Sequence, residues 1–212
     1  MRRLLLALAL CAPAPALAED ITIQNLMRAE SDTMFRLTMQ TNGTNVGEIA
    51  HERQVVSADG PQPIIRPNQD TLYSSAIIDL SEPVTVTLPE GDGRFQSVLV
   101  ISQDHYNFAY AEPGAYELTE DEVGTRFAML LFRTFIDAGD PDDAARAHAV
   151  QDGIRLDGGG SGPFEAPDWD LENLGEARKA VSDLAAAVGL DASIAFGRQG
   201  EVDPLGHLIG MA

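Results

Sequence analysis

Five strand-like runs follow one another between residues 50 and 111, and they constrain the fold more than any other feature of the sequence. They cover residues 50–57, 70–80, 84–89, 94–101 and 105–111. Val84, Val86 and Leu88 alternate with threonines, the period-2 pattern of a strand buried on one face. Residues 126–136 alternate less cleanly and are apolar on both faces, which is typical of a central strand. The middle of the chain is therefore expected to form a sheet.

Helical patterns precede and follow these strands. Residues 22–40 and 171–188 are amphipathic at helical spacing, and Asp140-Pro141 predicts the start of a third helix that runs to about Gly153. The glycine-rich run 158–163 predicts a flexible loop, and it lacks the Gly-Lys-Ser/Thr ending of a phosphate-binding loop. Together these patterns predict an α+β fold, with an antiparallel or mixed sheet flanked by helices.

The first 18 residues have the pattern of a secretory signal peptide. Arg2 and Arg3 precede an apolar run that is too short to span a bilayer, and Ala16-Leu17-Ala18 provides small residues at a cleavage site. Cys11 offers an alternative as a lipidated cysteine, although Leu10 is large for that role. We expect cleavage after Ala18, a periplasmic location and no membrane insertion of the mature chain.

The mature chain is strongly acidic and contains no cysteine. Cleavage leaves 194 of 212 residues, with 12 Lys+Arg against 33 Asp+Glu and a net charge of −21. Such a surface repels phosphate backbones and anionic lipids, which argues against nucleic-acid partners. Disulfides, thiol nucleophiles and cysteine-ligated metals are excluded, because Cys11 is the only cysteine in the sequence.

Residues 64–80 carry the densest group of candidate site residues. Hydrogen-bonding side chains crowd into ten positions at the start of a core strand, among them Arg66, Asn68, Asp70, Thr71, Tyr73, Ser74 and Ser75. One interpretation is functional, with Asp70 as a general base, Tyr73 as a hydrogen-bonding acid and Arg66, Asn68 and Thr71 binding a ligand. The other is structural, with Asn68 and Asp70 capping backbone amides and Arg66 pairing with Asp70.

A second candidate site follows the strand at 94–101. His105 has the chemistry of an acid–base catalyst, and its neighbours Asp104 and Tyr106 are candidate ligand-binding residues. The alternative is a histidine that only bonds to backbone. The four histidines of the mature chain have no helix-borne metal spacing, so neither a metal nor an organic cofactor is expected.

The sequence resembles the secreted bacterial proteins of domain-of-unknown-function family 1254. The run Arg66-Pro67-Asn68-Gln69-Asp70-Thr71-Leu72-Tyr73-Ser74 is similar to the family's Asn-Arg-Asp-Thr-Leu-Tyr-Ser signature. Further ordered matches are His51 with Arg53, Asp104-His105-Tyr106, Val123-Gly124-Thr125-Arg126, Arg133-Thr134, His148-Ala149-Val150-Gln151-Asp152, Trp169-Asp170, Val202-Asp203-Pro204 and His207-Leu208-Ile209-Gly210. The resemblance implies an α+β first domain and no established activity.

Two features depart from this family. Gln69 occupies a position that is usually arginine. Family members also continue past the Leu-Ile-Gly element into a jelly-roll-like β domain, domain of unknown function 1214, which this sequence lacks. We therefore expect a domain over 19–200 and read residues 201–212, a capped helix start with nothing to fold back against, as the beginning of a truncated element.

Two functional hypotheses follow. The first is a small-molecule binding or envelope assembly module, organised around Arg66, Asn68, Asp70 and Tyr73, whose partner is a small polar ligand or the missing β domain. The second is a cofactor-independent enzyme that uses Asp70, Tyr73 and His105 for proton transfer on a small polar or carboxylate-bearing substrate. No complete catalytic constellation can be assembled from the sequence, which favours the first hypothesis.

Overall fold

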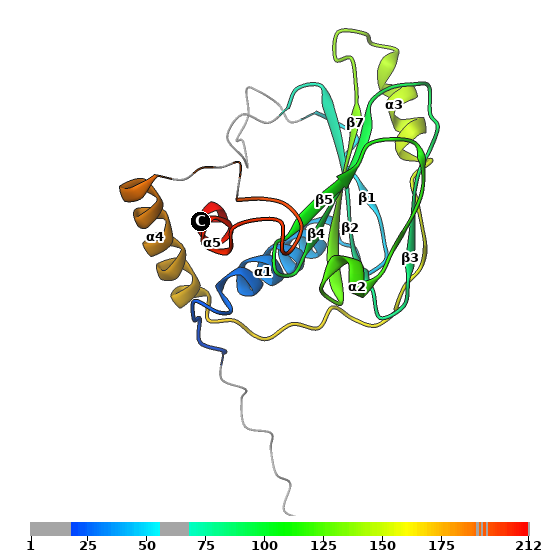
Figure 1. Cartoon of the computed structure of the whole chain (residues 1–212). Coiled ribbons are helices and arrows are strands. Elements are labelled where there is room, and N and C mark those ends of the chain that lie inside the picture. The colour runs from blue at the N-terminus through cyan, green and yellow to red at the C-terminus, as the bar shows by residue number, and fades with distance from the viewer. Residues whose placement is uncertain (1–17, 56–67, 190, 192, 194, 212) are drawn as a thin grey trace, which may run out of the picture.

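The computed structural model describes residues 18–55, 68–189, 191, 193 and 195–211. The predicted signal peptide, except for Ala18, and the predicted ligand-binding residue Arg66 lie outside these ranges. No helix within the described residues has the length and apolar character that crossing a membrane requires. The described chain combines two antiparallel sheets with helices, and the predicted α+β class is confirmed (Figure 1).

The larger sheet has five strands, and every pair of neighbours in it is antiparallel. In spatial order they are β1 (Ala50–His51), β2 (Thr71–Asp79), β7 (Phe127–Phe135), β4 (Gln96–Ser102) and β5 (Asn107–Tyr110). The smaller sheet consists of β6 (Gly114–Leu118), β3 (Val84–Leu88) and β8 (Arg155–Gly158), in that order. The apolar strand predicted at 126–136 is β7, at the centre of the larger sheet as expected.

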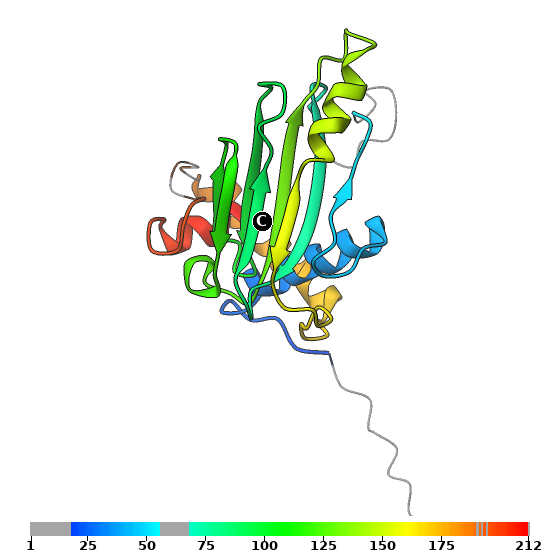
Figure 2. The same ribbon diagram turned by 90° about the vertical axis from the view of Figure 1, so that its right-hand side faces the viewer.

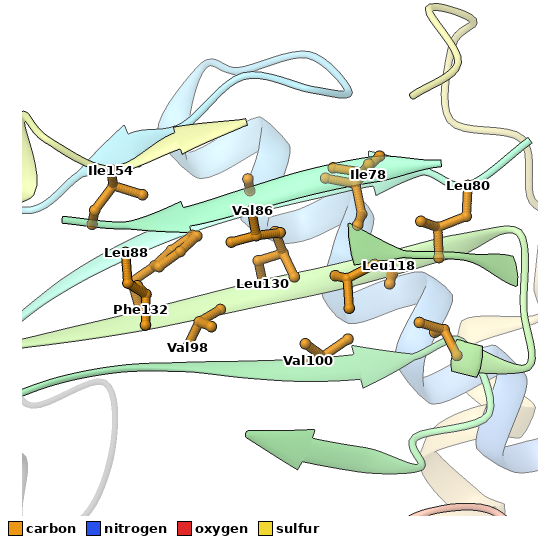
Figure 3. Close-up of a cluster of buried hydrophobic side chains, with 14 residues drawn as sticks. Ile78, Leu80, Val86, Leu88, Val98, Val100, Leu118, Leu130, Phe132 and Ile154 are labelled. Atoms are coloured by element: carbon orange, nitrogen blue, oxygen red, sulfur yellow. The ribbon is translucent and has the colours of Figure 1, made fainter. Parts of the chain in front are cut away.

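The main hydrophobic core lies between the two sheets. Val86 and Leu88 of β3 pack with Val98 of β4 and with Leu130 and Phe132 of β7 (Figure 3). The threonines that alternate with these β3 residues are only partly buried. This confirms the predicted one-sided burial of the strand, because successive side chains point to opposite faces.

Helices cover part of the other face of the larger sheet. The helix α1 (Leu26–Asn42) lies on this side together with α4 (Leu171–Val188) and α5 (Pro204–Met211) (Figures 1 and 2). Phe35 of α1 is fully buried and packs against Ile77, Ile101 and Met129, one from each of three neighbouring strands. The N-terminal end of α1 packs against the start of α4 through a separate apolar cluster.

Three local predictions differ from the structure. The third helix, α3 (Asp143–Gln151), begins after the predicted cap, because Asp140 accepts the amide of Asp142 in a turn. The short helix α2 (Glu120–Val123) and the strands β6 and β8 were not expected. Strand β8 runs into the glycine-rich segment predicted as a flexible loop.

The glycine-rich segment is held by backbone hydrogen bonds to the neighbouring strand. The amides of Gly159 and Gly160 donate to the carbonyls of Pro83 and Asp79. A Cβ on Gly158 would lie 2.5 Å from the carbonyl oxygen of Pro83, and its φ of +88° suits glycine. Glycine is therefore required at position 158 by the close approach of the two backbones.

The element α5 packs on the rest of the chain, contrary to the expectation that it has nothing to fold back against. Leu208 contacts the cluster of Leu26, Trp169 and Leu174, which joins α5 to α1 and α4. His207 is 2% exposed, and its ring nitrogens bond the backbone carbonyls of Ala195 and Asp104. These contacts attach α5 to the turn between β4 and β5.

Candidate ligand-binding site

The part of the larger sheet that α1 leaves uncovered carries a row of polar and aromatic side chains. Tyr73 pairs with Arg133 across β2 and β7, and Arg133 pairs with Ser97 across β7 and β4. Directly paired residues of antiparallel strands project to the same face. Side chains of a strand alternate between its two faces, so Arg133, four positions after Met129, projects to the same face as Met129. Met129 packs under Phe35, and the row therefore lies on the α1 side of the sheet.

Two phenylalanines lie next to this row, farther along the strands from the residues that α1 covers. The amide of Phe135 donates to the carbonyl of Phe95, so these residues lie opposite each other where β4 begins. Their side chains are 40% and 59% exposed, respectively. Apolar rings of this size are seldom left uncovered without a reason when they lie next to each other. We call the surface formed by Tyr73, Phe95, Ser97, Arg133 and Phe135 the sheet site.

Arg133 is the charged centre of the sheet site. The residue is exposed, and its guanidinium has neither a hydrogen-bond nor an ion-pair partner among the described residues. Most other described arginines pair with a carboxylate: Arg94, for example, pairs with Asp92 and Asp143 and holds the pKa of each carboxyl at about 2. An unpaired guanidinium in so acidic a chain is available to an incoming anion.

The described residues of the predicted cluster at 68–73 lie at the edge of the sheet site. Asn68 donates its side-chain amide to the hydroxyl of Tyr73 at 3.2 Å. The hydroxyl of Thr71 donates to the Asp70 carboxylate at 3.0 Å, and Asp70 is exposed. The backbone carbonyl of Asp70 accepts the amide of Ile136. The structure thus brings Asn68 and Tyr73 together, whereas Asp70 turns to its neighbour Thr71.

His105 lies in the turn between β4 and β5 and has a left-handed backbone, with φ +65°. Its Nδ1 lies 3.2 Å from the hydroxyl of Ser31 on α1. Burial, with a smaller contribution from the nearby ring of His207, lowers the pKa of His105 to about 4. A positive φ is uncommon for a residue other than glycine, and contacts such as the one with Ser31 help to hold His105 in this conformation.

The neighbours of His105 are engaged with other elements. The carboxylate of Asp104 accepts from Arg28 Nε on α1 at 2.7 Å. The ring of Tyr106 stacks on His207 of α5, with the ring centres 4.2 Å apart. The predicted ligand-binding residues Asp104 and Tyr106 therefore connect the turn to two helices.

A buried carboxylate completes this network beneath the turn. Asp32 of α1 is fully buried and accepts hydrogen bonds from Gln103 Nε2 at 2.7 Å and from Trp169 Nε1 at 3.1 Å. Desolvation raises the pKa of Asp32, against these stabilising hydrogen bonds. Each of these polar groups has a partner, and the bonds join α1, the turn and the segment before α4. The network has the properties of a structural junction.

The two predicted centres lie at opposite ends of the larger sheet. Ser102, just before His105, is level with Ile78, because both residues pair with Ala128. Asp70 precedes Ile78 by eight residues, and at the rise of an extended strand this separation is about 25 Å. The hypothesis of one acid–base site containing Asp70, Tyr73 and His105 therefore does not agree with the structure.

Sequence reasoning missed the centre of the sheet site. The sequence interpretation included Arg133 only as one of the family matches and assigned it no role in a site. At the end of α3, Arg53 is the residue that pairs with Asp152 and bonds Gln151. The sequence does contain a sign of this residue. Met129, Leu131 and Arg133 share one face of an apolar strand, and Arg133 is the charged residue that interrupts it. As for metals, no group of three or more potential ligands occurs in the described ranges.

Comparisons with known proteins support the resemblance and the fold. The family described as "Protein of unknown function (DUF1254)" matches residues 46–120, which confirms the predicted resemblance. No curated protein matches the chain. The crystal structure of the VPA0106 protein from Vibrio parahaemolyticus is similar in fold, with a TM-score of 0.52 and 19% identity, over 89% of this chain and 54% of that one. This chain thus spans about half the length of that protein.

Proposed function

We propose that the sheet site binds a small carboxylate-bearing molecule. The proposal is drawn from the residues of the site, because the family that matches residues 46–120 has no known function. The observation that carries this proposal is Arg133, an exposed guanidinium without a partner among the described residues. It lies on the central strand of the sheet, between the hydroxyl-bearing side chains Tyr73 and Ser97. A binding module agrees better with this arrangement than an enzyme does.

The chemistry of the site favours a carboxylate attached to an apolar group. Guanidinium donors match the two oxygens of a carboxylate, and the paired geometry is stronger than a neutral hydrogen bond. The hydroxyls of Tyr73 and Ser97 add neutral donors on either side. The exposed rings of Phe95 and Phe135 provide an apolar surface beside the cation. Benzoate has both groups and is therefore a suitable probe.

The proposal predicts that benzoate raises the melting temperature of the protein, whereas its neutral analogue benzamide does not. A ligand that binds only the folded state stabilises it in proportion to its occupancy. Arg133→Gln should abolish the shift with benzoate and leave the melting temperature of the free protein nearly unchanged, because the side chain is exposed and unpaired. Differential scanning fluorimetry measures both effects.

Arg155→Gln is the matched control. Arg155 is also an exposed arginine without a partner among the described residues, but it lies on β8 in the smaller sheet. This variant should keep the full response to benzoate. If benzoate gave no shift in the unmodified protein, or if both glutamine variants lost the shift equally, carboxylate binding at the sheet site would be rejected.

A further inference from the structure

A pocket of about 610 Å³ lies between the C-terminal end of α1 and the glycine-rich segment. Its walls include Arg36, Gln40 and Thr44 from α1 and the following turn, and Ser161 and Phe164 from the glycine-rich side. We call it the loop pocket. Its volume is typical of small-molecule sites and it shares no lining residue with the sheet site.

Several polar groups of the loop pocket have no protein partner. The side chains of Gln40, Thr44 and Ser161 form no hydrogen bond within the described residues. Arg36 donates only to the backbone carbonyls of Ala166 and Pro167, at 3.4 and 3.1 Å, so other donors of its guanidinium remain available. The pocket therefore presents donors and acceptors of mixed type around one space.

The loop pocket has a partial negative charge from the C-terminus of α1 and a positive charge from Arg36. Helix α1 ends at Asn42, and its last turn contains no basic side chain. The free carbonyls of a helix C-terminus have partial negative charge, which disfavours an anion. The guanidinium of Arg36 disfavours a cation. A neutral ligand with several hydroxyl groups satisfies both, because a hydroxyl donates to the carbonyls and accepts from the guanidinium.

The pocket also has an apolar wall. Met39 and Phe164 line it, and the ring of Phe164 is fixed by contacts with Phe35 and Phe127, with ring centres 6.0 and 4.9 Å apart. A fixed aromatic face attracts the polarised C–H groups of a flat ligand. We propose that the loop pocket binds a neutral saccharide, with its hydroxyls on the polar groups and its ring against Phe164.

Three sugars of equal ring size test the ligand class by saturation-transfer NMR titration. Glucose is neutral, glucuronate carries a negative charge and glucosamine a positive charge. Glucose should give the strongest transfer. Thr44→Val and Gln40→Ala should each weaken glucose binding about fivefold, which corresponds to the loss of one hydrogen bond. Both positions are at the surface or partly exposed, so neither change should lower the melting temperature substantially.

Gln24→Ala is the control for Gln40→Ala, since Gln24 is an exposed glutamine just before the other end of α1. It should bind glucose normally, and so should Arg133→Gln, which separates this proposal from the sheet site. Absence of glucose transfer in the unmodified protein, or pocket variants that both bind glucose as well as the unmodified protein does, would overturn the proposal. Tighter binding of glucuronate than of glucose would overturn the neutral class of ligand.

Discussion

At the scale of single residues, the backbone conformation and the protonation state of His105 indicate that this residue has a structural role. Its φ of +65° orients the ring toward Ser31, and burial lowers its pKa to about 4. The neutral ring satisfies the Ser31 hydroxyl without a counter-charge. We therefore interpret His105 as a residue that fixes the turn between β4 and β5 against α1, and its contribution to stability should depend on pH.

The direction of this dependence follows from the two pKa values. Above the ordinary value of 6.5, His105 is neutral in both the folded and the unfolded protein, so it makes no pH-dependent contribution. Between pH 6.5 and about 4 the unfolded chain takes up a proton that the folded chain does not. Stability should therefore fall across this interval, by at most about 3 kcal/mol at its lower end.

His105→Asn tests this prediction, because asparagine tolerates a left-handed backbone and does not titrate. Urea denaturation between pH 7 and pH 4 should show a smaller loss of stability in the variant than in the unmodified protein. Asp32, whose raised pKa acts in the opposite direction, is present in both proteins and largely cancels in the comparison. Parallel curves would contradict the interpretation of His105.

At the scale of elements, one glutamine holds α3 against the larger sheet. Gln151 is fully buried, and its amide nitrogen lies 3.1 Å from the carbonyls of Glu52 and Tyr73 and from the hydroxyl of Ser74. Ser74 also lies 2.8 Å from Nδ1 of His51 on β1. Ser74 is 2% exposed, so this serine and histidine serve the junction of β1, β2 and α3 rather than a reactive site.

Gln151→Leu should lower the free energy of unfolding by roughly 2 kcal/mol, because it leaves buried acceptors without a donor. Gln40→Leu, at an exposed position of α1, should change it by less than about 0.5 kcal/mol. Urea denaturation followed by circular dichroism measures both. Equal stability of the two variants would show that α3 is held by its apolar contacts alone.

The elements also show which parts of the fold can be predicted from sequence. Strands β3 and β7 were predicted because their burial is expressed in local alternation or in continuous apolar character. Strand β6, Gly114–Leu118, has only one buried residue, and β8 contains arginine, aspartate and glycine. Their strand character comes from pairing with β3, which is a non-local interaction that residue patterns do not express.

At the scale of the whole molecule, the candidate site depends on which strands become neighbours. Asn68 and Tyr73 could be identified from a dense local cluster, and the structure brings them together. Arg133 follows Tyr73 by 60 positions in the chain and becomes its neighbour only through the register of β2 with β7. The distance between Asp70 and His105 likewise depends on how β7 pairs with β2 and β4. Neither the pairing of Tyr73 with Arg133 nor this distance could therefore be predicted from the sequence.

The three-layer arrangement explains why the sheet site stays open. The smaller sheet covers one face of the larger sheet, and α1 packs on the other face over Ile77, Ile101 and Met129. Beyond these residues, the same face carries the exposed side chains of Phe95, Arg133 and Phe135 in the sheet site. Periplasmic location and contact with a following β domain remain predictions, and the open face is compatible with either a ligand or a further domain.

The most direct test of the central claim is a titration of the isotope-labelled protein with benzoate, followed by amide chemical shifts in NMR spectra. Binding at the sheet site predicts that the largest shifts occur at Tyr73, Ser97 and Arg133 and at their strand neighbours, and that they disappear in Arg133→Gln. Shifts confined to the loop pocket or to the turn at His105, or no saturable shifts at all, would contradict the account.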